Sequence, residues 1–184
     1  QKMDSPILQL AKDFQASFFA DRYTPDFTDE FQPSLMGLGA GRFVNLEEYN
    51  PAFIVECLWT ISRLDNSHPN DIVVLGSRIS LLKDIDHLIR CGDHCRERTL
   101  TTFEKKEFKG SQQDLKRARD RKKYGFNLNS GVLKLATIHS FKGYESPTVF
   151  LIVDDDDSPE LVYVGLTRAK LNLVVCASST SPFA

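Results

Sequence analysis

Four short runs of mostly apolar, often β-branched residues constrain the fold of this 184-residue chain more than any other feature. The runs cover residues 72–75, 133–138, 149–153 and 173–177. Continuous apolar runs of this length are typical of strands that are buried on both faces, as in a parallel sheet. Because segments with a helical spacing of apolar residues also lie along the chain, we predict one three-layer α/β domain with a mainly parallel central sheet over residues 1–184.

The remaining elements follow from turn residues and apolar spacing. Prolines open helices near Pro6 and at Pro51, and further helices are expected at about 79–89 and 159–169. Shorter strands are expected at 42–46 and 99–103, and a last strand at 171–177. Residues 23–38 have the composition of a loop, and residues 112–123 suggest a highly charged surface helix. Strand and helix therefore alternate along most of the chain.

Composition excludes several classes of protein. The chain is 41% hydrophobic and 26% charged, which suits a well-cored globular domain. It has no run of about 18 uncharged apolar residues and no basic-then-apolar leader, so we expect a cytoplasmic protein with no membrane partner. The four cysteines are too few and too unevenly spread for a disulfide framework.

A metal site is not expected. His87, Cys91, His94 and Cys95 are the one candidate zinc group, but adjacent His94 and Cys95 have poor geometry for two ligands of one ion. The four acids at 154–157 stand just before an expected helix, where carboxylates favour the helix dipole.

Charge is segregated along the chain. Residues 90–124 hold twelve Lys or Arg against six Asp or Glu, a net charge of +6, so the remainder carries −8 of the overall −2. The densest part, 116–123, lies near Phe108, Tyr124 and Phe126. Basic residues beside aromatic ones suit single-stranded nucleic acid. The alternative is a solvated loop, and sequence leaves both interpretations open for the basic segment 93–130.

Two polar blocks adjoin the apolar runs near the end of the chain. The first, at 137–145, contains hydroxyls, an imidazole, a Lys-Gly pair and an acid: Thr137, His139, Ser140, Lys142, Gly143 and Glu145. Lysine offers a compact charge to phosphate, glycine allows close backbone approach, and glutamate accepts from a sugar hydroxyl. The block therefore predicts contacts with phosphate, ribose or nucleic acid near strand ends.

The second block, at 160–170, places Arg168 directly before the last apolar run. An arginine backed by a rigid core can stabilise a phosphoryl group during its transfer. The alternative is a surface arginine near a helix C-terminus, where the dipole favours a cation.

Together the two blocks resemble motifs V and VI of the UvrD-like (UvrD/Rep/PcrA) superfamily 1 helicases. These motifs run close to T-[LI]-H-x-x-K-G-x-E and L-x-Y-V-[GA]-x-T-R-A. The matching residues are Thr137, Ile138, His139, Lys142, Gly143 and Glu145, followed by Leu161, Tyr163, Val164, Gly165, Thr167, Arg168 and Ala169. The order of the surrounding elements is similar to the family's C-terminal RecA-like domain.

For nucleotide chemistry, the resemblance implies that Arg168 is an arginine finger for the γ-phosphate of ATP. It implies that Glu145 contacts the ribose and that Lys142 and Gly143 lie near the phosphates. Tyr163 and Thr167 would support the finger. The chain contains no G-x-x-x-x-G-K-[ST] loop and no Asp-Glu magnesium motif. ATP and Mg²⁺ would therefore be held mainly by an N-terminal RecA-like domain, and we expect this chain alone to be inactive.

For nucleic acid, the resemblance implies that Thr137, His139 and the adjacent Ser140 contact a single strand, with DNA the expected kind. The family commonly inserts an accessory domain where the basic segment 93–130 lies in this chain. The expected function is that of the C-terminal motor domain of a helicase or translocase. Two alternatives stay open: a non-catalytic nucleic-acid-binding module, and a nucleotide-gated switch or defence component of helicase ancestry.

Overall fold

The computed structural model describes residues 6–19, 40–92, 97–104, 126 and 130–183. Six strands in this part of the chain form one sheet in the order β1-β6-β5-β2-β4-β3, and every neighbouring pair is parallel. The strands are β1 (Ala40–Leu46), β2 (Ile72–Gly76), β3 (Thr99–Thr101), β4 (Leu133–Thr137), β5 (Ser146–Ile152) and β6 (Ala169–Ser178). The predicted α/β class with a parallel sheet is confirmed.

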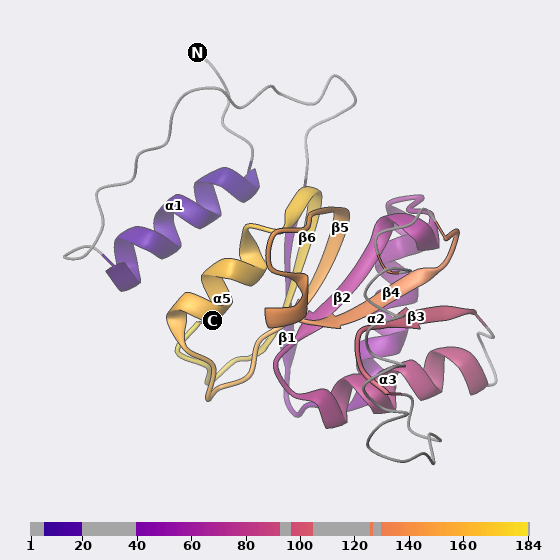
Figure 1. Ribbon diagram of the computed structural model, residues 1–184. Helices are drawn as coiled ribbons and strands as arrows, with labels where there is room; N and C mark the ends of the chain where they lie inside the picture. Colours follow the sequence, from indigo (N-terminus) through magenta and orange to yellow (C-terminus); the bar gives the residue numbers. More distant parts are fainter. Residues whose placement is uncertain (1–5, 20–39, 93–96, 105–125, 127–129, 184) are drawn as a thin grey trace, which may run out of the picture.

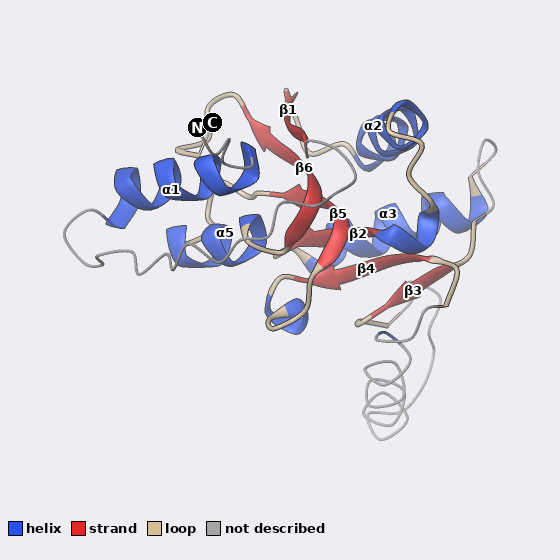
Figure 2. Cartoon of the chain, turned by 90° about the horizontal axis from the view of Figure 1, so that it is seen from above, coloured by secondary structure: helices blue, strands red, loops and turns tan. Residues whose placement is uncertain are grey.

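Helices cover both faces of this sheet, so the domain has three layers (Figures 1 and 2). Helices α1 (Pro6–Phe19) and α5 (Pro159–Leu166) lie on one face. Helices α2 (Pro51–Leu64) and α3 (Ile79–Cys91) lie on the other. Two 3-10 turns, η1 (Pro69–Asp71) and η2 (His139–Phe141), complete the described elements.

Strand β2 explains why the apolar runs predicted this architecture. All five of its residues are buried. Val73 and Leu75 pack with the core under α1 and α5, whereas Ile72 and Val74 pack with the core under α2 and α3. Side chains alternate between the two faces of a strand, so a strand covered on both sides is mostly apolar.

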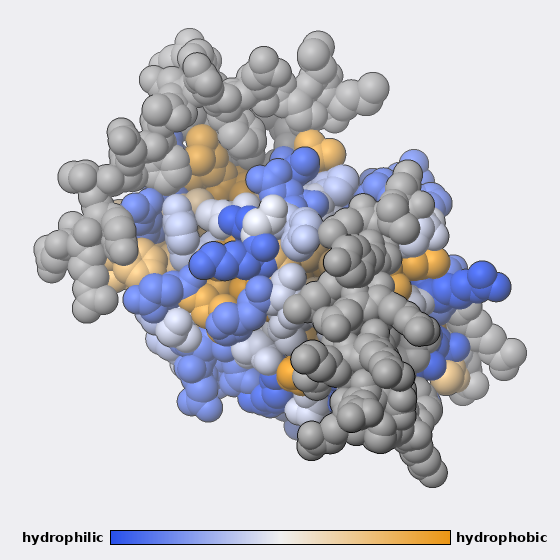
Figure 3. All heavy atoms as spheres, in the orientation of Figure 1, coloured by the Kyte–Doolittle hydropathy of each residue, from blue (hydrophilic) through white to orange (hydrophobic). Residues whose placement is uncertain are grey.

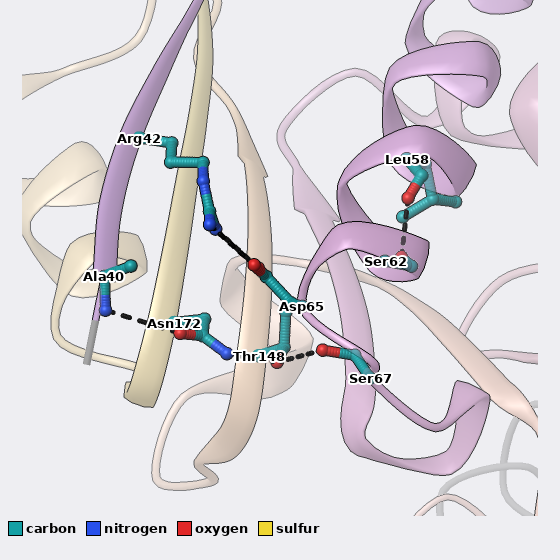
Figure 4. Close-up of polar contacts among 8 residues, drawn as sticks. All are labelled: Ala40, Arg42, Leu58, Ser62, Asp65, Ser67, Thr148 and Asn172. Atoms are coloured by element: carbon teal, nitrogen blue, oxygen red, sulfur yellow. Dashed lines mark hydrogen bonds and ion pairs between the residues drawn. The ribbon is translucent and has the colours of Figure 1, made fainter. Parts of the chain in front are cut away.

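The expected starts of the helices are confirmed where a cap is present. Helix α2 begins at Pro51, and the side chain of Asn50 accepts a hydrogen bond of 2.9 Å from the backbone N–H of Ala52. At its other end, Asp65 forms a two-pronged ion pair with Arg42 of β1, with N–O distances of 2.5 and 2.6 Å (Figure 4). This pair joins the edge strand to the helix that covers it.

Two predicted boundaries were wrong at the second polar block. The helix expected at 159–169 ends at Leu166, and the last strand begins at Ala169 instead of residue 171. The reason is strand pairing: Ala169 lies opposite Ser146 of β5, which draws it into the sheet. Arg168 therefore sits in a tight turn between α5 and β6 and not in the last turn of the helix.

The edge strand β3 falls within the segment 93–130 and is shorter than the predicted 99–103. It is anchored by Asp86 of α3, which is fully buried. The Asp86 carboxylate accepts hydrogen bonds of 2.5 Å from the hydroxyl of Thr99 and 2.9 Å from Nε of Arg90. The expected loop at 23–38 and the charged helix at 112–123 lie outside the described residues.

The described surface on the side seen in Figure 3 is mainly hydrophilic, with apolar residues visible in separate areas. Cys57, Cys91 and Cys176 are free thiols, as expected, and Cys176 is buried in the core. Burial raises the pKa of the Cys176 thiol to about 12. No helix in the described ranges is both long enough and apolar enough to cross a lipid bilayer.

Candidate functional site

Arg168 is held in a defined position at the amino end of β6. Its Nε donates to the carbonyl oxygen of Val164 at 2.9 Å, and its Nη1 donates to the carbonyl oxygen of Tyr144 at 3.3 Å. Its Nη2 donates to the hydroxyl oxygen of Thr167 at 2.9 Å. A guanidinium has five N–H donors, so two remain for a ligand once these three bonds are made. The arrangement fixes the cation and leaves it able to bind an anion.

Thr167 supports this position, as the sequence predicted. Its hydroxyl lies 3.1 Å from the carbonyl oxygens of both Tyr163 and Val164, so it can donate to one of them while accepting from Arg168. Tyr163 acts through its backbone: its ring packs against Phe14 of α1, with ring centroids 6.4 Å apart. The hydroxyl of Thr167 is the direct support of the guanidinium.

Glu145 reaches the same end of the sheet. It immediately precedes β5, and the backbone N–H of the next residue, Ser146, donates to the carbonyl oxygen of Arg168 at 3.0 Å. Its carboxylate oxygen Oε2 lies 3.3 Å from Nζ of Lys170, the second residue of β6. The pairing of β5 with β6 therefore brings an arginine, a lysine and a glutamate together at the amino edge of the sheet.

Lys142 and Gly143 occupy the turn that leads to this edge. Lys142 is exposed and has no ion-pair partner in the described part of the chain. Gly143 has φ of +88°, and a Cβ there would meet no atom within 4 Å. Glycine is thus required by the left-handed backbone of the turn and not by crowding.

A polar group on the α2 face lies beside this edge (Figure 4). Thr148 of β5 is buried, and its hydroxyl lies 3.5 Å from the hydroxyl of Ser67. It also accepts from the amide nitrogen of Asn172 at 3.4 Å, and the amide oxygen of Asn172 accepts from the backbone N–H of Ala40 at 3.3 Å. These bonds link Ala40 of β1, Asn172 of β6 and Thr148 of β5, close to the amino ends of the strands that follow Glu145 and Arg168.

The residues predicted to contact a strand lie at the carboxyl end of β4. The hydroxyl of Thr137 donates to Ser140 Oγ at 2.8 Å and accepts from the Ser140 backbone N–H at 3.2 Å. Both His139 and Ser140 are exposed. Buried Phe141, with its ring centroid 5.9 Å from that of Phe126, anchors the turn that presents them. The result is a surface of hydroxyl and imidazole groups on a rigid support.

The sheet separates the two sets of predicted residues. At one end of β2, Gly76 pairs with Thr137 of β4, and at the other end Ile72 pairs with Thr148 of β5. Since β4 and β5 are parallel, residues 138–145 must return from the carboxyl edge to the amino edge. Thr137, His139 and Ser140 are therefore at the opposite edge from Arg168 and Glu145. Sequence placed all of them at strand ends without distinguishing the two edges.

A shallow hollow at the carboxyl ends of β2 and β5 was not predicted. It is lined in part by Gly76, Arg78 and Asp154, and it lies where β2 leads to a helix on one face and β5 to a helix on the other. Ligands of open α/β sheets commonly bind at such a reversal. Arg78 and Asp154 form an ion pair across it. The only sequence signal was the Gly-Ser-Arg that follows the strand at 72–75.

Tyr49 packs against Arg78, one of the residues that line this hollow. Its hydroxyl donates to the carbonyl oxygen of Val153 at 2.8 Å and lies 3.1 Å from Oδ1 of Asp155. Its ring centroid is 5.2 Å from the guanidinium carbon of Arg78. Burial, reinforced by the charge of Asp155, raises the pKa of Tyr49 to about 12. Asp154 and Asp155 thus have partners outside the acidic run, in Arg78 and Tyr49.

Two predicted features cannot be placed. His94, Cys95 and the basic run at 116–123 lie outside the described residues. Within the described residues, no group of three or more His, Cys, Asp or Glu side chains could hold a metal ion. Strand binding by the basic segment stays a prediction.

The three layers and the six-stranded parallel sheet are consistent with the predicted RecA-like fold. Residues 134–176 match the family model of the UvrD-like helicase C-terminal domain, a range that contains every residue of the two predicted sets. The resemblance stated from the sequence is confirmed by this match.

A solved structure agrees with the fold over the whole chain. It is the C-terminal domain of a possible DNA helicase from Lactobacillus plantarum WCFS1, with a TM-score of 0.52 and 15% sequence identity. The comparison covers 100% of this chain and 92% of that one. At this identity the likeness is one of fold. No curated protein matches the sequence of this chain.

Proposed function

We propose that this domain is the C-terminal motor domain of an ATP-dependent superfamily 1 helicase or translocase that acts on single-stranded nucleic acid, with DNA the expected kind. The observation that carries the proposal is the placement of Arg168. A guanidinium with three bonds to its own domain and two remaining donors stands beside a carboxylate at the amino edge.

The amino edge suits a nucleotide. Phosphoryl transfer develops charge on the oxygens of the transferred group, and a preorganised arginine stabilises that charge. Arg168 supplies this cation, Lys142 supplies a second one near the phosphates, and Glu145 accepts from a ribose hydroxyl. When bound, ATP with Mg²⁺ supplies the transferable phosphoryl group and the charge-neutralising ion. The amino edge lacks a set of acids for Mg²⁺ among its described residues, so we assign phosphate cradle and ion to an N-terminal RecA-like domain.

The carboxyl edge suits a nucleic-acid backbone. Hydroxyl and imidazole groups commonly bind phosphate and sugar oxygens, which positions the strand without reading its sequence. Thr137, His139 and Ser140 present these groups on one turn. Because residues 138–145 connect this turn to the amino edge, a change around the nucleotide can shift the strand contacts. That coupling is what a translocase requires.

The test is Arg168→Ala in the protein that carries this domain together with its N-terminal partner. Turnover of ATP in the presence of single strand is expected to fall by about 10³ or more, while ATP affinity changes little. Arg63→Ala is the matched control, because Arg63 is an exposed arginine on α2. Unchanged turnover in the Arg168 variant would overturn the finger assignment. ATP turnover that single strand does not stimulate would favour a nucleotide-gated switch over a motor.

A further inference from the structure

Lys170 forms an ion pair with Glu145 at the amino edge, and no role was predicted for Lys170 from the sequence. Its Nζ lies 3.3 Å from Oε2 of Glu145, and both side chains are more than half exposed, at 57% and 53%. Glu145 immediately precedes β5 and Lys170 lies in β6, and the first residues of these two strands, Ser146 and Ala169, are paired. The contact is therefore set by the register of the sheet.

An ion pair this exposed contributes little to folding stability, because water and salt screen both charges. The ion pair instead affects the orientation of the Glu145 carboxylate. Oε2 is engaged by Lys170, while Oε1 has no hydrogen-bond partner among the residues described here. A glutamate side chain has several freely rotating bonds, and the lysine narrows the orientations in which Oε1 can accept a hydrogen bond.

The position of Glu145 relative to Arg168 also suits a nucleotide at the amino edge. Arg168 is bound to the carbonyl oxygen of Tyr144, the residue before Glu145. The cation proposed for the phosphates and the carboxylate proposed for the sugar are thus fixed to one backbone segment. A carboxylate and a phosphate-binding cation held at a fixed distance can bind a sugar hydroxyl and a phosphate of the same nucleotide at the same time.

We propose that Lys170 is a positioning residue that holds the Glu145 carboxylate for recognition of a ribose hydroxyl of the nucleotide. This role rests on the proposed function, since it requires a nucleotide at the amino edge. Lys170 touches the carboxylate and not the reacting phosphate. It therefore governs how tightly the ribose is bound more than how fast the phosphoryl group is transferred.

The experiment compares ATP with 2′-deoxy-ATP and 3′-deoxy-ATP in steady-state turnover by the two-domain protein. Lys170→Met is expected to raise the KM for ATP about 3- to 5-fold with a smaller change in kcat. The KM for the analogue that lacks the recognised hydroxyl is expected to change by less than about 1.5-fold, because its contact is already absent. Lys170→Arg, which keeps the charge, should restore the KM for ATP. Lys83→Met removes a lysine paired with Glu104 at 3.8 Å on the other face of the sheet and serves as the control.

Glu145→Ala distinguishes failure of the proposed ribose contact from failure of the positioning role of Lys170. If it leaves the KM for ATP unchanged, the ribose contact in the proposed function is wrong. If it raises that KM and Lys170→Met does not, the positioning role of Lys170 alone is overturned. If Lys170→Met raises the KM equally for ATP and both deoxy analogues, Lys170 binds phosphate and the positioning role is likewise overturned.

Discussion

Replacing Thr167 with valine exchanges the hydroxyl that supports Arg168 for a methyl group and preserves the shape of the side chain. The Thr167 hydroxyl accepts from Arg168 Nη2 at 2.9 Å and lies 3.1 Å from two helix carbonyl oxygens. Valine cannot accept, so the guanidinium keeps only its bonds to Val164 and Tyr144. The weaker of these, to Tyr144, measures 3.3 Å.

The expected loss of turnover in Thr167→Val follows from the strength of the hydrogen bond between Arg168 and the Thr167 hydroxyl. A hydrogen bond to a charged group contributes about 1.5–3 kcal/mol, and the partly exposed position of Arg168 lets water replace some of it. A loss of about 1–2 kcal/mol in orientation at the transition state corresponds to roughly 5- to 30-fold slower turnover. The assay is phosphate release at saturating ATP and single strand. The turnover of the Thr167→Val variant should lie between that of the parent protein and that of the Arg168→Ala variant.

Thr167→Ser is the control, because serine retains the hydroxyl and should turn over nearly as fast as the parent. Circular dichroism and thermal unfolding of each variant check that its helix content and stability match those of the parent protein. The reasoning is refuted if Thr167→Val is as fast as the parent while Arg168→Ala is slow. It also fails if the serine and valine variants are equally slow, since the hydroxyl would then be irrelevant.

Three further predictions concern the fold. Gly143→Ala should lower the free energy of unfolding in urea by about 1–2 kcal/mol, because an L side chain is strained at φ of +88°; no loss would mean that the turn is not left-handed. The pKa of Tyr49, about 12 when folded, exceeds its value of 10.0 when unfolded, so stability should fall as pH rises from about 10 to 12. Tyr49→Phe should reduce that fall in thermal unfolding, and an unchanged decline would contradict the burial of the hydroxyl. Iodoacetamide should modify exposed Cys91 in the native protein and buried Cys176 only after unfolding. Peptide mass spectrometry reads both sites, and modification of Cys176 in the native protein would contradict its burial in the core.

The layers of the domain could be predicted from sequence because their cause is local. A run such as 72–75 has no polar residue, so both faces of that strand must be covered. The start of α2 could also be predicted from sequence, since Pro51 suits the first turn of a helix. The candidate site residues were predicted from two motifs whose spacing is short.

The division of the site between two edges could not be predicted, because it depends on strand register. Whether residues 138–145 stay at one edge or cross to the other is decided by how β4 and β5 align with β2. The end of α5 was missed for a similar reason: Ala169 has good helix propensity, but its pairing with Ser146 draws it into β6. The ion pair of Lys170 with Glu145 arises from the same pairing and has no signature in sequence.

Nucleotide chemistry is proposed at the amino edge and strand binding at the carboxyl edge, and one paired measurement tests this division most directly. In the two-domain protein, ATP turnover at saturating strand and strand affinity without nucleotide are compared for Arg168→Ala and His139→Ala. Arg168→Ala should reduce turnover by about 10³ and change strand affinity by less than about 2-fold. His139→Ala should weaken strand binding more than it lowers turnover at saturation. If Arg168→Ala weakens strand binding as much as His139→Ala does, the two edges are not separate sites and the account is contradicted.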